Sequence, residues 1–273
     1  MAKNDYKESL TVKPSTGALA PRPVFARPLD NELSKTLSEF MIVPRIKIVQ
    51  KSAQGGLGDE FKTGTVLIMP NKGVIAQREE PFLFVPLHFY VDYTKQAPVG
   101  SDEFILERSA NPDSWIAKKS RDPKQRKELV PNTNPPQYIS YVETLNFVVT
   151  LFNHPLAGMP LFLSFSKGEH YSGRQFINLF KMREAAFECT VFQGQTGKRE
   201  RKGFDWYGFD IVNPNVSGAS PWVEDETLLE KLSTMQKIIR DAFAHGSLKA
   251  AEEEDLIPEA ETLQADAGQA AGM

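Results

Sequence analysis

The sequence has a single cysteine in 273 residues, and its apolar runs fall well short of the roughly 18 residues that a membrane-spanning helix needs. Cys189 alone cannot form an internal disulfide, which fits a reducing compartment. The first five residues, Met1 to Asp5, lack the charged-then-apolar pattern of a signal peptide. We therefore expect a cytoplasmic protein with no membrane partner.

Signatures of catalysis are also missing. The glycine-rich segment 52–59 lacks the Gly-Lys-Ser/Thr ending of a phosphate-binding loop, and no Gly-x-Ser-x-Gly motif occurs. Cys189 lies in an apolar, strand-like pattern, which favours a buried thiol over a nucleophile. The histidines are scattered, and none stands at metal-ligand spacing from another ligand: His88, His154, His170 and His245. These absences predict a protein that is not an enzyme and that holds no metal or cofactor.

Basic residues are absent after Lys249, whereas seven acidic residues follow it: Glu252, Glu253, Glu254, Asp255, Glu259, Glu261 and Asp266. Of the 35 acidic residues 28 therefore lie before this tail, against 32 basic residues, so the body carries a charge of +4. A mildly basic body with an acidic tail is typical of a nucleic-acid binder. Such a tail would recruit a partner protein or occupy its own basic groove. A solvated terminus that keeps the protein soluble explains the same composition.

The hydrophobic pattern predicts a mostly β chain with a few helices, an α+β fold. Strand patterns cover residues 45–50, 64–69, 81–93, 138–152, 161–166, 187–192 and 204–211. A helix pattern at 172–183 lies between two of these strands, and its apolar residues Phe176, Leu179 and Phe180 are expected to pack on them. The order predicts a β-barrel or sandwich across residues 41–220. Residues 1–40 are predicted to be a flexible arm, and residues 247–273 a disordered acidic tail.

Residues 94–137 differ in character from the strands around them and predict a basic, exposed insertion. Six of the ten residues from Lys118 to Lys127 are basic, and three prolines follow within the next ten residues. Such a charge run is most often a solvated loop. Trp115 stands just before the run, and the order of tryptophan and then basic residues also fits nucleic-acid binding.

The longest helix pattern runs from Pro221 to His245 and is followed by Gly246, so we predict a C-terminal helix over 221–246. Ser220 is the expected N-cap, and Pro221 suits a first turn. One face is apolar through Leu228, Leu232, Met235, Ile239 and Phe243. This face fits docking on the barrel and equally fits pairing with a second copy in a homo-oligomer.

The segment 197–211 has the clearest functional pattern. A predicted basic hairpin tip, formed by Lys198, Arg199, Arg201 and Lys202, leads directly into an aromatic strand. Alternation places Tyr207, Phe209 and Ile211 on one face, which we assign to the core. The other face then presents Phe204 and Trp206 beside the positive charges. Single-stranded nucleic acid is held in this way, by cations along its backbone and aromatic rings under its bases. Half-buried packing of Trp206 under a loop is the alternative.

Further candidates for the same groove lie elsewhere in the chain. Arg45 and Lys47 share the polar face of the first strand, and Lys167 and Arg174 surround the turn between a strand and a helix. Tyr90 belongs to a strand that is apolar or aromatic on both faces, so it is either buried or part of an aromatic face left open for stacking.

Three pieces of the chain, in this order, resemble single-stranded DNA-binding proteins of tailed bacteriophages. The pieces are Val43 to Ser52 with the following Phe61 to Gly64, Leu161 to Lys167 with Ser172 to Leu179, and Phe187 to Phe192 with Trp206 to Ile211. The resemblance covers roughly residues 42–93 and 140–215. The chain departs from that group in its basic insertion, its long C-terminal helix and a tail that ends in Ala-Gly-Met instead of an aromatic residue.

The resemblance implies an OB-type β-barrel that binds and protects single-stranded DNA during phage replication or recombination, in the cytoplasm of the host cell. It implies no catalysis and no sequence readout. The acidic residues Glu252, Glu253, Glu254 and Asp255 correspond in kind to tails that contact phage or host replication proteins. The alternative from another class is a structural protein of the phage virion or of its assembly.

Overall fold

The computed structural model describes residues 42–51, 57–98, 101, 103–201, 204–216, 218–246 and 249–250. The N-terminal segment predicted to be flexible (1–40), the acidic residues of the tail and Lys202 lie outside the described residues. The fold is mostly β with a few helices, which confirms the predicted α+β class. A short parallel pair joins β1 (Ile42–Val43) to β12 (Lys249–Ala250), inside the segment predicted as tail.

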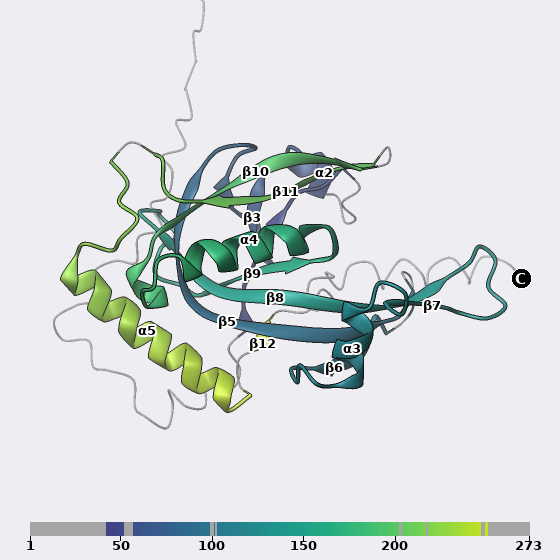
Figure 1. Cartoon of the computed structure of the whole chain (residues 1–273). Helices are drawn as coiled ribbons and strands as arrows, with labels where there is room; N and C mark the ends of the chain where they lie inside the picture. Colours follow the sequence, from purple (N-terminus) through teal and green to yellow (C-terminus); the bar gives the residue numbers. More distant parts are fainter. Residues whose placement is uncertain are drawn as a thin grey trace, which may run out of the picture.

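Ten strands form one mixed sheet, whose main path runs in the order β11-β10-β5-β8-β9-β2-β3-β4 (Figure 1). The pairs are antiparallel except for β2 with β9, which is parallel. Strands β6 and β7 add to the outer halves of β5 and β8. The strands are β2 (Arg45–Ile48), β3 (Val66–Met69), β4 (Gly73–Ala76), β5 (Phe82–Gln96), β6 (Ile105–Ser109), β7 (Lys127–Leu129), β8 (Tyr138–Phe152), β9 (Leu161–Ser166), β10 (Phe192–Arg201) and β11 (Phe204–Val212).

The sheet curls around an aromatic core, and β5 bends strongly around it (Figure 1). Its two end strands, β11 and β4, are not paired with each other within the described residues, so the sheet is not closed by backbone hydrogen bonds. Side chains connect its two ends instead: Thr196 on β10 donates to the Gly64 carbonyl at 3.0 Å, and the Glu79 amide donates to Thr196 at 2.9 Å. The end strands are thereby held near each other without a ladder.

A bulge in β5 explains why this strand is apolar on both faces. The register with β8 shifts between Pro86 and His88. The even-numbered residues before this bulge and the odd-numbered residues after it therefore face the same side of the sheet. Phe82 and Phe84 before the bulge face the main core, and Phe89 and Val91 after it pack against the same core. The opposite face of β5 is buried as well, in a second cluster.

The helix α4 (His170–Lys181) fills the curled sheet, as the pattern over 172–183 predicts. Phe176 is fully buried, with its ring 4.3 Å from Phe147 and 4.8 Å from Phe192 between centroids. Leu179 and Phe180 pack against the same cluster. The chain then turns through a short 3-10 helix, η2 (Phe187–Cys189), where we predicted a strand over 187–192. The Phe187 ring stacks on Phe180 at 4.1 Å, and this contact holds the turn that leads into β10.

The C-terminal helix α5 (Glu226–Ala244) starts later than predicted. Its N-cap is Asp225, whose side chain accepts from the Leu228 amide at 2.9 Å, so the prediction of Ser220 as the cap is wrong. The residues before α5 run alongside η2. The Val223 amide donates to the Cys189 carbonyl, and the Val191 amide donates to the Pro221 carbonyl. Leu232 and Ile239 bury the apolar face of α5 against Val85, Leu87, Val148 and Phe162 of the sheet. The face predicted for docking or subunit pairing is therefore occupied by the chain's own sheet.

The insertion 94–137 folds, contrary to the expectation of a solvated loop. Strand β5 continues to Gln96, and the chain then forms β6, the helix α3 (Trp115–Arg121) and β7 before β8 returns along β5. A small core of Tyr93, Ile116, Ala117 and Tyr141 fixes α3 on the two long strands. We call the unit formed by β6, α3, β7 and the paired outer ends of β5 and β8 the arm.

Candidate nucleic-acid interface

The edge strand β11 is sealed by two side chains. The Gln50 amide group pairs with both backbone groups of Tyr207, donating to its carbonyl at 2.8 Å and accepting from its amide at 2.9 Å. Glu169 accepts from the Phe209 amide at 2.9 Å. A Cβ at Gly208 would lie 2.2 Å from the Glu169 carboxylate, so only glycine leaves room for this contact. The backbone groups at the middle of the β11 edge thus have hydrogen-bond partners. The outer face of this strand contains the residues predicted to bind nucleic acid.

Trp206 lies half-buried on that outer face. Its indole nitrogen donates to Glu169 at 2.9 Å, and its ring lies over Gly168, where an added Cβ would be 3.5 Å from the indole. Arg199 is its direct cross-strand partner. The core side of the strand holds Tyr207, Phe209 and Ile211, all buried, so the predicted division of the two faces is confirmed for these three residues.

The positive charges of the hairpin are partly neutralised by its own acidic residues. Arg199 forms an ion pair with Asp210 at 2.5 Å, and this hydrogen bond raises the pKa of the guanidinium. Asp205 pairs with Lys198 at 3.4 Å and also with Lys51, and the bond to Lys51 lowers the pKa of the carboxyl. The tip is therefore less basic than the run of cations suggests. The two aspartates stand in the aromatic strand itself, so the sequence did carry this signal.

The rest of the predicted tip is described only by its backbone. Residues 198–201 belong to β10 and are not turn residues, and Arg201 is the register partner of Phe204. Lys202 lies outside the described residues. The backbones of Phe204 and Arg201 therefore pair at the end of the ribbon that contains Trp206 and Arg199.

Lys167 lies immediately before α4, and Arg174 lies within its first turns. Lys167 belongs to the 3-10 turn η1 (Lys167–Glu169) immediately before α4, next to the glycine under the indole, and its ammonium lies 5.8 Å from the Phe104 ring. Arg174 is exposed on the first turns of α4 and forms an ion pair with Glu143 at 3.8 Å. The outer face of the hairpin and the start of α4 thus form one surface, defined by Lys167, Arg174, Arg199 and Trp206. We call it the hairpin surface. The structure does not place Lys198 there, because Lys198 is the register partner of Tyr207 and lies with Asp205 on the other face of the hairpin.

Three other predicted residues lie elsewhere. Tyr90 is covered by α5, with its ring 4.7 Å from that of Phe243, and burial raises its pKa to about 12. The nearby charge of Arg45 opposes this rise, which places Arg45 beside Tyr90. Arg45 and Lys47 alternate with the buried Ile46 and Ile48 on β2, so they lie on the sheet face away from the main core. The structure does not join Tyr90 to the hairpin surface, because the β5 bulge turns this tyrosine towards α5.

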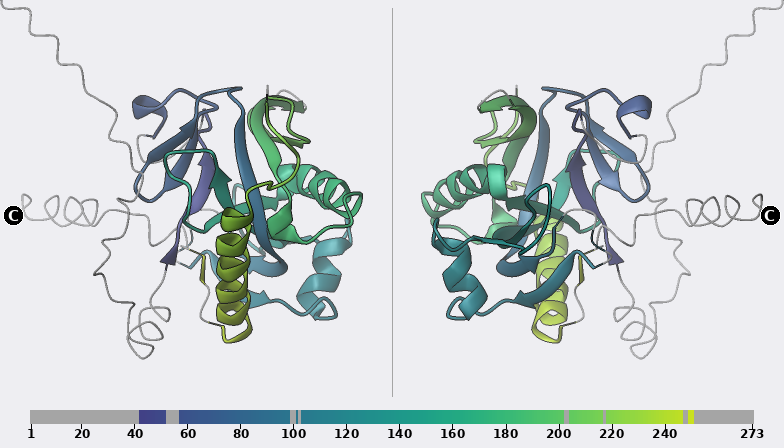
Figure 2. Two further views of the ribbon diagram at one scale, coloured as in Figure 1. Left: turned by 90° about the vertical axis from the view of Figure 1, so that its left-hand side faces the viewer. Right: turned by 90° about the vertical axis from the view of Figure 1, so that its right-hand side faces the viewer.

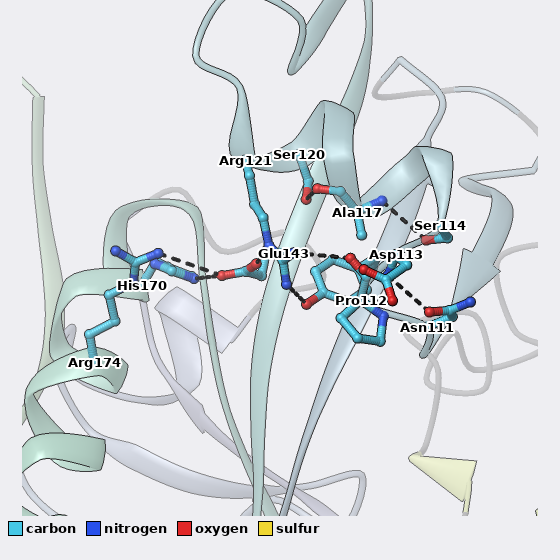
Figure 3. A network of polar contacts seen from close by, with 11 residues as sticks. Asn111, Pro112, Asp113, Ser114, Ala117, Ser120, Arg121, Glu143, His170 and Arg174 are labelled. Atoms are coloured by element: carbon cyan, nitrogen blue, oxygen red, sulfur yellow. Dashed lines mark hydrogen bonds and ion pairs between the residues drawn. The ribbon is translucent and has the colours of Figure 1, made fainter.

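A polar network connects the hairpin surface to the arm (Figure 3). Glu143 on β8 accepts from His170 at 2.7 Å on one side and from Arg121 of α3 at 3.0 Å on the other. Arg121 also donates to the Tyr93 hydroxyl and to the Pro112 carbonyl. The bond from His170, followed by that from Arg121, lowers the pKa of Glu143 to about 2. Sequence reasoning did not find this carboxylate, whose partners are 22 to 31 positions away in the chain.

The remaining titratable groups offer little for catalysis. Burial raises the pKa of the Cys189 thiol, which disfavours the reactive thiolate. Burial under α5 lowers the pKa of His88. The described ranges contain no group of three or more His, Cys, Asp or Glu residues arranged to hold a metal ion. Among the helices described, none is long and apolar enough to cross a membrane.

The arrangement therefore combines a half-buried indole, a cross-strand arginine and two cations from η1 and α4, on a curled sheet. Such a surface can bind a polyanion whose planar rings are exposed, as the bases of single-stranded nucleic acid are, and it can do so without reading the sequence. Comparison with known protein families, with curated proteins and with solved structures finds no match for this chain.

Proposed function

We propose that this protein binds single-stranded DNA without sequence preference through the hairpin surface, and that it protects the strand during phage DNA replication or recombination. The proposal includes no catalysis. The observation that carries it is the position of Trp206, a half-exposed ring opposite Arg199 and next to Lys167. A base stacked on this ring would leave its phosphates within reach of the surrounding cations.

The curled sheet supports the proposal. We interpret it as an OB-like barrel that is completed by side chains, with α4 between β9 and β10 and the hairpin β10–β11 projecting from it. Barrels of this type bind single strands in a basic groove with aromatic platforms. Lys198 and Arg199 form ion pairs with aspartates. Binding would therefore rely on base stacking, and each of these cations would have to leave its aspartate to contact a phosphate.

Titration of the tryptophan fluorescence with oligo-dT and with a duplex of the same length tests the proposal. At about 0.1 M salt we expect quenching and a salt-sensitive affinity for the single strand, and much weaker binding of the duplex, whose bases cannot reach the ring. Equal affinity for both would contradict stacking. Absence of binding to either would contradict the function and favour the virion or assembly role.

A further inference from the structure

We infer that the arm is a second contact surface for single-stranded nucleic acid, separate from the hairpin surface and used by the same strand. This inference rests on the proposed function and extends it, because it predicts how far a bound strand reaches. The residues that carry it are the exposed Trp115 and the lysines beside it. Tyr138, the other exposed aromatic residue of the arm, lies on the opposite face of the β7–β8 pair, because it alternates with Ile139 and Tyr141, which face α3.

Both aromatic rings of the arm are open to solvent and have cations near them. Trp115 and Tyr138 are each 45% exposed. Lys119 lies 5.5 Å and Lys95 5.8 Å from the centre of the Trp115 ring, and Lys127 lies 5.8 Å from that of Tyr138. The face of a ring that also adjoins a cation suits a nucleotide, because the base stacks while its phosphate meets the ammonium.

The charge of the arm is less neutralised than that of the hairpin. Between residues 105 and 129 the chain has seven basic residues and four acidic ones. Lys118, Lys124, Arg126 and Lys127 are exposed, and their side chains form no ion pair within the part of the chain that the structure describes. In the hairpin, by contrast, Lys198 and Arg199 both have aspartate partners. The arm is therefore the stronger attractor of phosphates of the two surfaces.

The arm is built as a fixed platform and does not need to order on binding. The N-cap Ser114 of α3 accepts from the Ala117 amide at 3.2 Å, and Ile116 is buried against Tyr93 and Tyr141. The Trp115 indole is oriented by a bond to Glu107 at 3.1 Å. Pre-formed rings lose little conformational entropy when a base stacks on them.

The two surfaces are in position to share one strand. In Figures 1 and 2, α4 lies between the hairpin and the arm. The Glu143 network ties the start of α4 to α3, and Arg174 and Arg121 lie on opposite sides of this carboxylate (Figure 3). A cation of the hairpin surface, Arg174, and a cation of the arm, Arg121, thus lie on either side of Glu143. A strand that leaves Trp206 past Lys167 and Arg174 reaches the arm along this line.

Single-stranded nucleic acid fits the arm better than an acidic protein segment, which is the other polyanion that lysines attract. A carboxylate-rich peptide would use the cations but would gain little from the face of Trp115. A duplex would present its phosphates and hide its bases. The Trp115 ring therefore distinguishes the partners, and Trp115 is the residue to change.

The test compares the affinity for oligo-dT of about 6 and about 30 nucleotides, a range that brackets one and several binding surfaces. For Trp115→Ala we expect the affinity for the long oligonucleotide to fall about 5- to 100-fold. The affinity for the short one should fall much less, because the intact hairpin surface still binds it. Tyr138→Ala removes an equally exposed ring from the opposite face of the β7–β8 pair and should change the affinity for the long oligonucleotide by less than about twofold. Tyr138 is exposed at the start of β8, so its substitution should leave the melting temperature unchanged.

Charge changes provide the matched control. The double variant Lys118→Ala, Lys124→Ala should weaken binding of the long oligonucleotide and reduce its salt dependence, whereas Lys231→Ala, Lys237→Ala on the exposed side of α5 should not. Wild-type affinity for the long oligonucleotide in Trp115→Ala would overturn the inference while leaving the proposed function intact. Weaker binding in the lysine variant alone would also overturn it, in favour of a general polyanion surface. Failure of the wild type to bind either length would refute both proposals.

Discussion

At the scale of single residues, Trp206 has one observed role and one proposed role, which a measurement can separate. Its indole nitrogen anchors Glu169, which in turn holds the edge of β11 at Phe209. This contact agrees with the prediction of half-buried packing. Stacking of a base on the remaining area of the ring stays a prediction.

We expect Trp206→Ala to weaken single-strand binding by about 1–3 kcal/mol, the value of one lost stack. The dependence of affinity on salt should remain close to that of the wild type, since no phosphate contact is removed. Trp206→Phe is the control, because it keeps a ring and loses the bond to Glu169. A lower melting temperature with unchanged affinity in Trp206→Ala would assign the residue to packing alone.

Asp205 should oppose binding, because its carboxylate neutralises Lys51 and Lys198. We expect Asp205→Asn to raise the affinity for oligo-dT about twofold to fivefold at low salt, because a screened repulsion is removed and two lysines are released. Asp241→Asn on α5 makes the same change in net charge away from the hairpin surface. Equal gains in both variants would show that net charge alone, and not this position, controls affinity.

Glu143 predicts a specific dependence of stability on pH. Its pKa is about 2 in the folded protein, against an ordinary value of 4.5, so the folded state favours the carboxylate. The stabilisation is therefore complete above about pH 4.5 and is lost as the pH falls towards 2. Glu143→Gln should lower the free energy of unfolding by about 1–3 kcal/mol at neutral pH. Denaturant unfolding over this pH range should show the difference from wild type shrinking below pH 4.5, and a constant difference would refute the assignment.

At the scale of elements, α5 depends on the sheet for its place. Ile239 is 1% exposed in the cluster with Val85 and Phe162, whereas its neighbour Ile238 is 56% exposed. We expect Ile239→Ala to lower the free energy of unfolding by about 2–5 kcal/mol, and Ile238→Ala by less than about 0.5 kcal/mol. Thermal or denaturant unfolding of the two variants measures this. Similar small effects in both would mean that α5 is not docked on the sheet.

The elements that the sequence predicts well are those whose pattern is local. Strands β8 and β9 have the predicted bounds, because their alternation is uninterrupted. The predicted start of α5 was too early, because the backbones of Trp222 and Val223 pair with the segment around Thr190 and do not enter the helix. This is a contact between segments that are distant in the sequence. The arm was predicted as a loop because its core is formed by Ile116 meeting Tyr93 and Tyr141, which lie 23 and 25 positions away.

The candidate site follows the same rule. Alternation in β11 correctly separated Tyr207, Phe209 and Ile211 from the outer face. It could not show that Gln50 and Glu169 seal the strand, because these residues come from other parts of the chain. Tyr90 was placed with the ligand residues because a bulge that reverses parity is invisible in an apolar run.

At the scale of the whole molecule, the protein is one curled sheet with α4 inside it and α5 on one face. Two projections, the hairpin and the arm, lie on either side of α4 (Figure 2). Both projections present a half-exposed or exposed ring beside cations. The α5 side, by contrast, covers its aromatic residues Tyr90 and Phe243 by packing them together. Nucleic acid should therefore contact the side of the hairpin and the arm.

Ultraviolet cross-linking of the intact protein to oligo-dT, with the modified peptides identified by mass spectrometry, shows directly which side of the protein the single strand contacts. We predict cross-links in the peptide that contains Trp206, absent when the oligonucleotide is annealed to its complement. Cross-links confined to α5 or β2, or equal modification by single strand and duplex, would contradict the claim.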